Sequence, residues 1–293
     1  MAPLMESIML SDLTEVPFIK IGDFTLEFEL GPPSPELQEV ARKELRESPE
    51  LQKQSIARLQ ELLKAEKDLK CPLDNEAWLI RFLRPCKYYP ESAVDLIKHY
   101  YNFKVKHANV YDNLKPSREQ NIFEHNILTV LPNRDQHGRR ILIIELGKKW
   151  KHNKCSLDEV YKGCVLYLEA AMLEPSTQIA GAVVIFDMDG LTLQQTWQFT
   201  PPFAKRIVDL LQEAMPVRIK NIHIVNQPYV FNMIIFHGTD RKSLHQYMSP
   251  KCLPAQYGGT LEMKTIDGPQ WYSLLIQVDK EYEAISSYGY KKK

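Results

Sequence analysis

The residues of this chain best suited to acid–base chemistry are two aspartates, Asp187 and Asp189, which directly follow an apolar run. If that run is a parallel strand, its carboxyl end is where α/β proteins gather their sites. The segment also has the form of a turn, because aspartates at strand ends accept backbone N–H bonds and Gly190 permits a positive φ. We favour the turn and expect neither aspartate to act as a catalytic acid or base.

The histidines offer little for catalysis or metal binding. His237 and His245 lie eight residues apart with no third ligand at a useful spacing, and His223 lies within an apolar run. No GxGxxG, GxxxxGK[ST], GxSxG or HExxH sequence is present. We therefore predict a protein that is not an enzyme and has no cofactor and no metal. The enzyme hypothesis requires Asp187, Asp189 and His223 to converge on a substrate.

The composition limits the partners and the compartment. Lys plus Arg and Asp plus Glu number 37 each, so no overall charge draws the chain to nucleic acid, and an anion-binding surface must be local. Its five cysteines are scattered without a CxxC pair, which is typical of reduced thiols in the cytosol. The N-terminus lacks a secretory signal, and no apolar run approaches the roughly 20 residues of a spanning helix. We predict a soluble, cytoplasmic protein.

The first third of the chain predicts four short helices in a unit covering residues 34–115, preceded by an extended arm (1–33). Each helix has a start signal, which is a capping Ser or Asp or a proline at the first helical position. The four starts are Ser34-Pro35, Ser48-Pro49, Asp74 and Pro90.

After Pro116 the pattern changes to strands alternating with helices, which predicts βαβ crossovers and a mainly parallel sheet flanked by helices. Ser156 and Glu159 form a capping box. The expected elements are a hairpin of 127–131 and 141–146, a helix from Ser156 to about Glu174, a strand at Ala182–Phe186, a helix from Thr200 to about Glu213, a strand at Ile219–Val225 and a last helix after Asp267.

Five separated segments, taken in order, resemble the signature of the CRAL-TRIO family of lipid-transfer proteins, closest to its α-tocopherol transfer protein and cellular retinaldehyde-binding protein group. Each motif is weak alone, but their order over residues 74–259 is specific. They are Asp74–Arg84 with Ala93 (DNEAWLIRFLR…A), Asp135–Ile141 (DQHGRRI), Gly181–Gly190 (GAVVIFDMDG), Pro216–Pro228 (PVRIKNIHIVNQP) and Leu253–Gly259 (LPAQYGG).

The resemblance implies a lipid-binding domain over residues 116–262, followed by a C-terminal helix and basic tail (263–293). It implies a deep apolar pocket for one lipid, lined by Tyr161, Cys164, Leu168, Ala182, Leu193, Trp197, Phe199, Ile207, Leu210, Leu211, Met215 and Val217. Helical spacing independently places two subsets of these on one face each, the first three residues and the three from Ile207 to Leu211. Without the resemblance, such stripes indicate ordinary core.

The resemblance also implies transient membrane association through phosphoinositide headgroups. Arg218 and Lys220 fall on the family's two phosphate-contacting positions, and as an R-x-K pair in extended chain both point the same way. A third basic position of the family falls on Cys86, with Lys87 adjacent. Solvated surface charge is the alternative for all three basic residues.

Between Pro228 and Leu253 the chain is shorter than its relatives by about fifteen residues, roughly four helical turns. The missing part is the helix that lids the pocket, so an open cavity and weak ligand retention are expected. We predict binding and transfer of a tocopherol, retinoid or carotenoid-like lipid. The alternatives are phosphatidylinositol or phosphoinositide exchange and trafficking, and an interaction module with a vestigial pocket.

Overall fold

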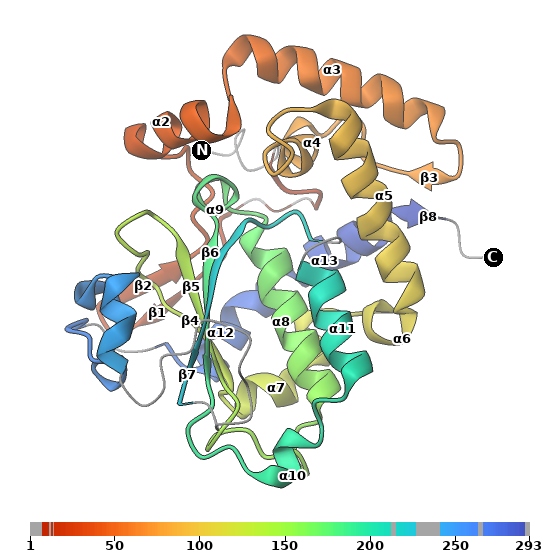
Figure 1. Cartoon of the computed structure of the whole chain (residues 1–293). Coiled ribbons are helices and arrows are strands. Elements are labelled where there is room, and N and C mark those ends of the chain that lie inside the picture. Colours follow the sequence, from red (N-terminus) through yellow and green to blue (C-terminus); the bar gives the residue numbers. More distant parts are fainter. Residues whose placement is uncertain are drawn as a thin grey trace.

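The computed structural model describes residues 8–11, 13, 15–211, 215–226, 241–262 and 266–290, around a four-stranded sheet in the order β4-β5-β6-β7 (Figure 1). The strands β4 (Leu128–Val130) and β5 (Arg140–Glu145) form the expected antiparallel hairpin. The strands β6 (Ala182–Asp187) and β7 (Ile219–Val225) continue the sheet in parallel with β5. The predicted α/β class with a mainly parallel sheet is confirmed.

Residues 34–115 form five helices, and the first three of them lie above the sheet in Figure 1. They are α2 (Pro35–Leu45), α3 (Pro49–Ala65), α4 (Glu76–Leu83), α5 (Pro90–Lys106) and α6 (Ala108–Tyr111). Ser34 and Ser48 cap α2 and α3 as expected, accepting from the third backbone N–H of each helix at 3.3 and 3.2 Å. The expectation for α4 was wrong by one residue. Asn75, and not Asp74, caps it, because its Oδ1 accepts from Trp78 N at 2.7 Å.

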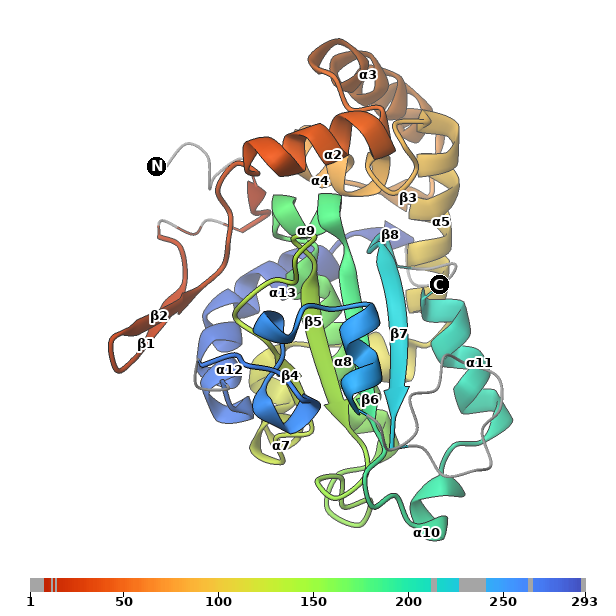
Figure 2. The ribbon, with the colours of Figure 1, turned by 60° about the vertical axis from the view of Figure 1, so that its left-hand side comes forward.

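The two faces of the sheet have different covers. On one face, side chains of β4 to β7 join a large core with α8 (Leu157–Ala171) and α12 (Gly268–Leu275). On the other face a smaller core is closed by the segment from η3 (Arg241–Gln246) to η5 (Ala255–Tyr257), which lies in front of the sheet in Figure 2. Leu253 and Tyr257 of the LPAQYGG motif are completely buried there, so this motif seals one side of the sheet.

Of two expected helix ends, one differs and the other lies outside the described residues. The helix opened by Ser156 ends at Ala171 and not near Glu174, because Pro175 starts a separate helix, α9 (Pro175–Ala180), and favours an extended residue before it. The α-helix α11 (Pro201–Asp209) continues as π-helix over residues 210–211, and the expected end near Glu213 lies outside the described part (212–214).

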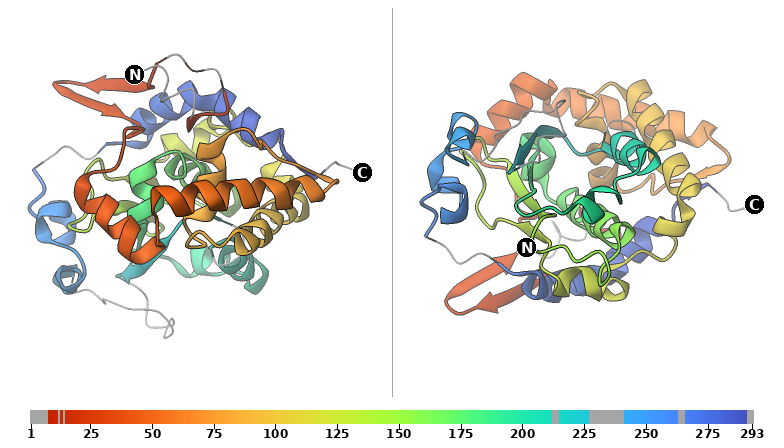
Figure 3. Two further views of the ribbon diagram at one scale, coloured as in Figure 1. Left: turned by 90° about the horizontal axis from the view of Figure 1, so that it is seen from above. Right: turned by 60° about the horizontal axis from the view of Figure 1, so that its bottom comes forward.

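The two ends of the chain are more ordered than expected. The arm contains a hairpin of β1 (Phe18–Ile21) and β2 (Phe24–Glu27), which projects from the body in Figure 3. In the tail, β8 (Gly289–Tyr290) pairs with β3 (Leu69–Lys70), and residues 291–293 lie outside the described part. The remaining elements are η1 (Pro116–Arg118), α7 (Gln120–Glu124), α10 (Leu193–Thr196), η4 (Pro250–Cys252), η6 (Ile276–Val278) and α13 (Asp279–Ser286).

Candidate functional site

An incompletely covered apolar surface lies where α8 and α11 meet the sheet. In Figure 1, α11 lies beside α8. The Phe203 ring lies 6.2 Å from the Tyr161 ring between centroids, and the Arg206 guanidinium lies 4.3 Å above the same Tyr161 ring. Arg206 also forms an ion pair with Asp158 of α8. Yet no residue within α11 is fully buried, so this helix is itself covered only in part.

Eight apolar side chains that pack against the core here are half-buried. We call them the apolar wall: Cys164, Phe186, Phe199, Phe203, Ile207, Leu211, Ile219 and Ile222. Burial raises the pKa of the Cys164 thiol to about 12, so this residue is a neutral, unreactive part of the wall at physiological pH.

A small pocket of about 50 Å³, with Ile219 of the wall in its lining, lies between the sheet, α8, α12 and the arm. Leu168 and Ala182 line it together with Tyr167, whose ring packs against Trp271 at 5.9 Å between centroids. The pocket has room for one or two water molecules, whereas sites for drug-sized ligands measure roughly 300–1,000 Å³. Any larger molecule at this place lies along the wall or displaces part of it.

The residues expected to line a pocket fall into three groups. Six are buried in the core: Tyr161, Leu168, Ala182, Leu210, Met215 and Val217. Four are half-buried residues of the wall: Cys164, Phe199, Ile207 and Leu211. Leu193 and Trp197 are 71% and 76% exposed. The structure therefore brings four of the expected residues to the wall and places two on the outer surface.

Leu193 and Trp197 form an exposed apolar tip on α10, at the bottom of the molecule in Figures 1 and 2. Gln195, buried between them, fixes this short helix to the loop after β5, because its Nε2 donates to the carbonyl oxygens of Gly147 at 3.0 Å and Trp150 at 2.5 Å. The same loop carries four exposed lysines, Lys148, Lys149, Lys151 and Lys154. The tip thus combines apolar and cationic side chains.

The expected basic pair lies at the other end of the sheet, where β7 begins. Arg218 Nη2 and Lys220 Nζ both donate to one oxygen, Oε2 of Glu44, at 2.5 and 2.9 Å. The two side chains point the same way, as expected of an R-x-K pair, and the group that they meet is a carboxylate of α2. Lys87 is exposed in the loop between α4 and α5, with a left-handed backbone (φ 50°).

The best acid pair of the sequence forms the favoured turn. Asp187 Oδ1 accepts from Asp189 N at 2.9 Å and from Asn226 Nδ2 at 2.8 Å, and Gly190 has φ 77°. Asp189 pairs with Lys148 and Arg241 at 2.8 and 3.4 Å. His237 lies outside the described part. Among the residues with described positions, no three His, Cys, Asp or Glu side chains gather as metal ligands do.

Three residues of the apolar wall were not predicted, although the periodicity of the sequence indicates them. Phe203 lies four residues before Ile207 and thus on the same helical face, and strand alternation places Phe186 and Ile222 on the α8 side of the sheet. No sequence signal indicated Glu44.

No described helix combines the length and hydropathy that crossing a membrane requires.

Comparison with known proteins yields relatives along most of the chain. Residues 124–235 match the CRAL/TRIO domain. A mouse protein named alpha-tocopherol transfer protein-like is 30% identical over 281 residues, which cover 87% of this chain and 81% of the relative. Human clavesin-2 is 29% identical over 275 residues, covering 87% and 82%. The solved structure of Sfh5 aligns over 86% of this chain and 99% of its own, with a TM-score of 0.45 and 14% identity.

Proposed function

The chain belongs to the CRAL/TRIO family, and from that premise we propose that it binds one hydrophobic lipid against the apolar wall and carries it between membranes in the cytoplasm. The proposed ligand is a tocopherol, a retinoid or a carotenoid-like molecule. No chemical step is part of the proposal. Its main support is the half-buried wall between α8, α11 and β7.

The energetics of transfer favour such a role. Covering several hundred Å² of apolar lipid surface stabilises the complex by roughly 25 cal/mol for each Å² removed from water. The inner pocket is small, so the proposal puts the ligand on the wall side of α11 rather than in a preformed deep hollow. We expect α11 to shift outward on binding, because its contacts with α8 run through few side chains.

Delivery needs contact with a bilayer, and we propose two surfaces for it. Arg218 and Lys220 receive a phosphoinositide headgroup, as two donors fixed toward one oxyanion suit a phosphate. The α10 tip inserts Trp197 and Leu193, while its lysines approach anionic lipid. Because β7 is the edge strand of the sheet, a membrane along this edge meets the basic pair at one end and α10 at the other.

The ligand is identified by native mass spectrometry of the protein purified from cells. We expect one isoprenoid lipid per chain in the wild type. Ile207→Asp places a charge on the wall and is expected to lower the occupied fraction at least tenfold, because an apolar ligand gives this charge no partner. Val208→Asp, one residue on and 48% exposed, is the matched control and keeps its ligand.

A co-purified phospholipid would instead favour phosphatidylinositol or phosphoinositide exchange. Absence of any lipid from the wild type would favour an interaction module with a vestigial pocket. Equal occupancy in Ile207→Asp and Val208→Asp would show that the ligand does not contact the wall.

Trp197→Ser tests the tip. An interfacial tryptophan removes a large apolar area from water, so we expect this change to weaken binding to phosphatidylcholine–phosphatidylserine vesicles about tenfold. Co-sedimentation measures it, and Val208→Ser on the exposed side of α11 serves as the control. Similar binding by both variants would exclude insertion of Trp197.

A further inference from the structure

Glu44 occupies the position that an anionic ligand of the basic pair would take. A single carboxylate oxygen accepts from both Arg218 and Lys220, as a phosphate oxygen held between two cations would. The Glu44 side chain is 48% exposed, whereas those of Arg218 and Lys220 are 15% and 25% exposed. The cations are therefore fixed in the protein, and the carboxylate reaches them from the solvent side.

The surroundings fix the cations and leave the carboxylate free to move. Arg218 also donates to the carbonyl oxygen of Ile179, so it keeps a partner when Glu44 leaves. Glu44 lies near the end of α2, where the helix dipole is unfavourable for an acid, so its own helix does not stabilise its charge. The backbone of α2 stays in place, because Ala41 and Leu45 are buried against Ile179.

Space for a headgroup lies directly beside this contact. A pocket of about 490 Å³ opens between α2, the β4–β5 turn and α9, and both Glu44 and Lys220 line it. Its lining also contains the donors Arg139 and His137 and the carboxylates of Glu29 and Glu36. Arg139 Nη1 lies 3.3 Å from Asn221 Oδ1 and 4.0 Å from Asp135, so its guanidinium is only lightly engaged.

Hydrogen bonds from Lys220 and Arg218 lower the pKa of Glu44 to about 2. The carboxylate therefore stays charged at physiological pH, and protonation does not remove it from the basic pair.

We propose that Glu44 is an internal competitor that occupies the basic pair until the phosphate of a membrane phosphoinositide displaces it into solvent. This inference rests on the proposed docking role of Arg218 and Lys220. It adds an affinity threshold: surfaces of low phosphate density do not displace Glu44, and surfaces rich in phosphoinositide do. The adjoining pocket then receives the polyol ring that carries the phosphate.

Glu44→Gln tests the competitor through binding to phosphatidylcholine vesicles doped with phosphatidylinositol bisphosphate. We expect it to bind these vesicles about three- to tenfold more tightly than the wild type, the range set by removing two partly exposed ion pairs. Glu39→Gln is the matched control, because it removes the same charge from α2 but Glu39 pairs with Arg42 and Lys43 of its own helix. Glu44→Asp, whose shorter side chain does not span both cations, is expected to bind more tightly as well.

The gain must depend on the basic pair. In an Arg218→Gln/Lys220→Gln background, Glu44→Gln is expected to change nothing. An equal gain in Glu39→Gln, or no gain in either Glu44 variant, would overturn the competitor. The docking role of the basic pair has its own test. It requires that Arg218→Gln/Lys220→Gln, with Glu44 unchanged, weakens binding to the same vesicles.

Discussion

Glu281→Ala is expected to lower the free energy of unfolding by about 3–5 kcal/mol, because it leaves a buried arginine without its counter-charge. Arg81 and Glu281 are 2% and 0% exposed and face each other at 3.8 Å, from α4 in the helical unit and α13 near the C-terminus. The second oxygen of Glu281 accepts from the backbone N–H groups of Leu10 and Ser11 at 2.8 and 2.9 Å. The pair therefore joins three distant segments of the chain.

Chemical denaturation measures this loss, and hydrogen exchange at Leu10 and Ser11 reports release of the N-terminal segment. Glu283→Ala on the same helix is the control, since that side chain is 58% exposed and pairs with Lys115 at the surface; we expect a change of at most about 1 kcal/mol. Replacing the pair by apolar residues, Arg81→Met with Glu281→Leu, should restore the part of the stability that the uncompensated arginine removes, but not the part due to the N–H groups of Leu10 and Ser11. Equal losses in the Glu281 and Glu283 variants would disprove a special role for the buried pair.

The sequence predicted those parts of the fold that local chemistry decides. The capping box of Ser156 and Glu159 is present, with Glu159 N donating to Ser156 Oγ at 3.2 Å and Ser156 N to Glu159 Oε2 at 2.7 Å. The strands from Ala182 and Ile219 are parallel neighbours, as apolar runs separated by helices require. The capping residues are near each other in the sequence, and the strands are recognised by their regular alternation with helices.

The contacts that decide the candidate site are not periodic. Glu44 lies 174 residues from Arg218 in the chain, and nothing in its local sequence distinguishes it from Glu39, whose partners are on its own helix. Residue type likewise does not tell an exposed apolar side chain from a buried one. Trp197 is 76% exposed and Leu210 is 1% exposed, although both are apolar. Such differences arise when segments pack, so a single sequence does not record them.

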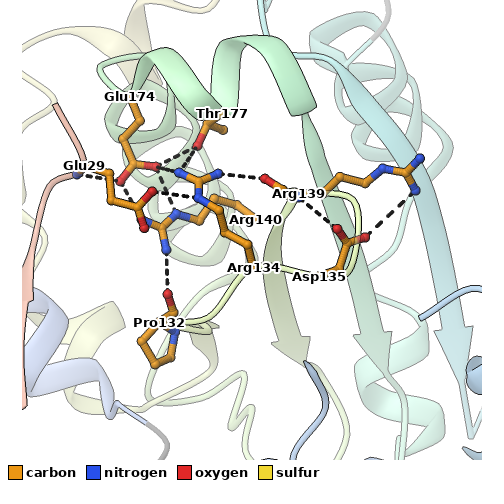
Figure 4. A network of polar contacts seen from close by, with 9 residues as sticks. Glu29, Pro132, Arg134, Asp135, Arg139, Arg140, Glu174 and Thr177 are labelled. Carbon is orange, nitrogen blue, oxygen red and sulfur yellow. Dashed lines mark hydrogen bonds and ion pairs between the residues drawn. The ribbon is translucent and has the colours of Figure 1, made fainter. Parts of the chain in front are cut away.

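The DQHGRRI segment forms the turn before β5 and also holds distant parts of the chain together. Asp135 Oδ1 closes its turn by accepting from His137 N and Arg139 N at 2.9 and 2.8 Å. Arg140, buried at the start of β5, donates to both oxygens of Glu174 at 2.9 and 2.7 Å and to Glu29 of the arm at 2.8 Å (Figure 4). The segment therefore anchors the arm and α9 to the sheet.

Glu174→Gln is expected to remove a pH-dependent part of the stability. Glu174 is buried between Arg140 and Arg134, and although burial alone raises its pKa, the charges and hydrogen bonds of these arginines lower it to about 2 from an ordinary 4.5. The unfolded chain thus binds this proton first as the pH falls. The stabilisation, about 3 kcal/mol, is complete above about pH 5 and is lost as the pH approaches 2.

The measurement is the free energy of unfolding against pH for the wild type and two variants. The Glu174→Gln variant should start about 3 kcal/mol lower at neutral pH, since its amide leaves two buried arginines under-compensated, and the difference should narrow as the pH falls toward 2. Glu61→Gln, on an exposed side chain of α3, should follow the wild-type curve. If the Glu174→Gln and wild-type curves instead stay parallel down to the acid limit, the buried carboxylate does not hold its charge in the folded protein. The network in Figure 4 would then act through packing alone.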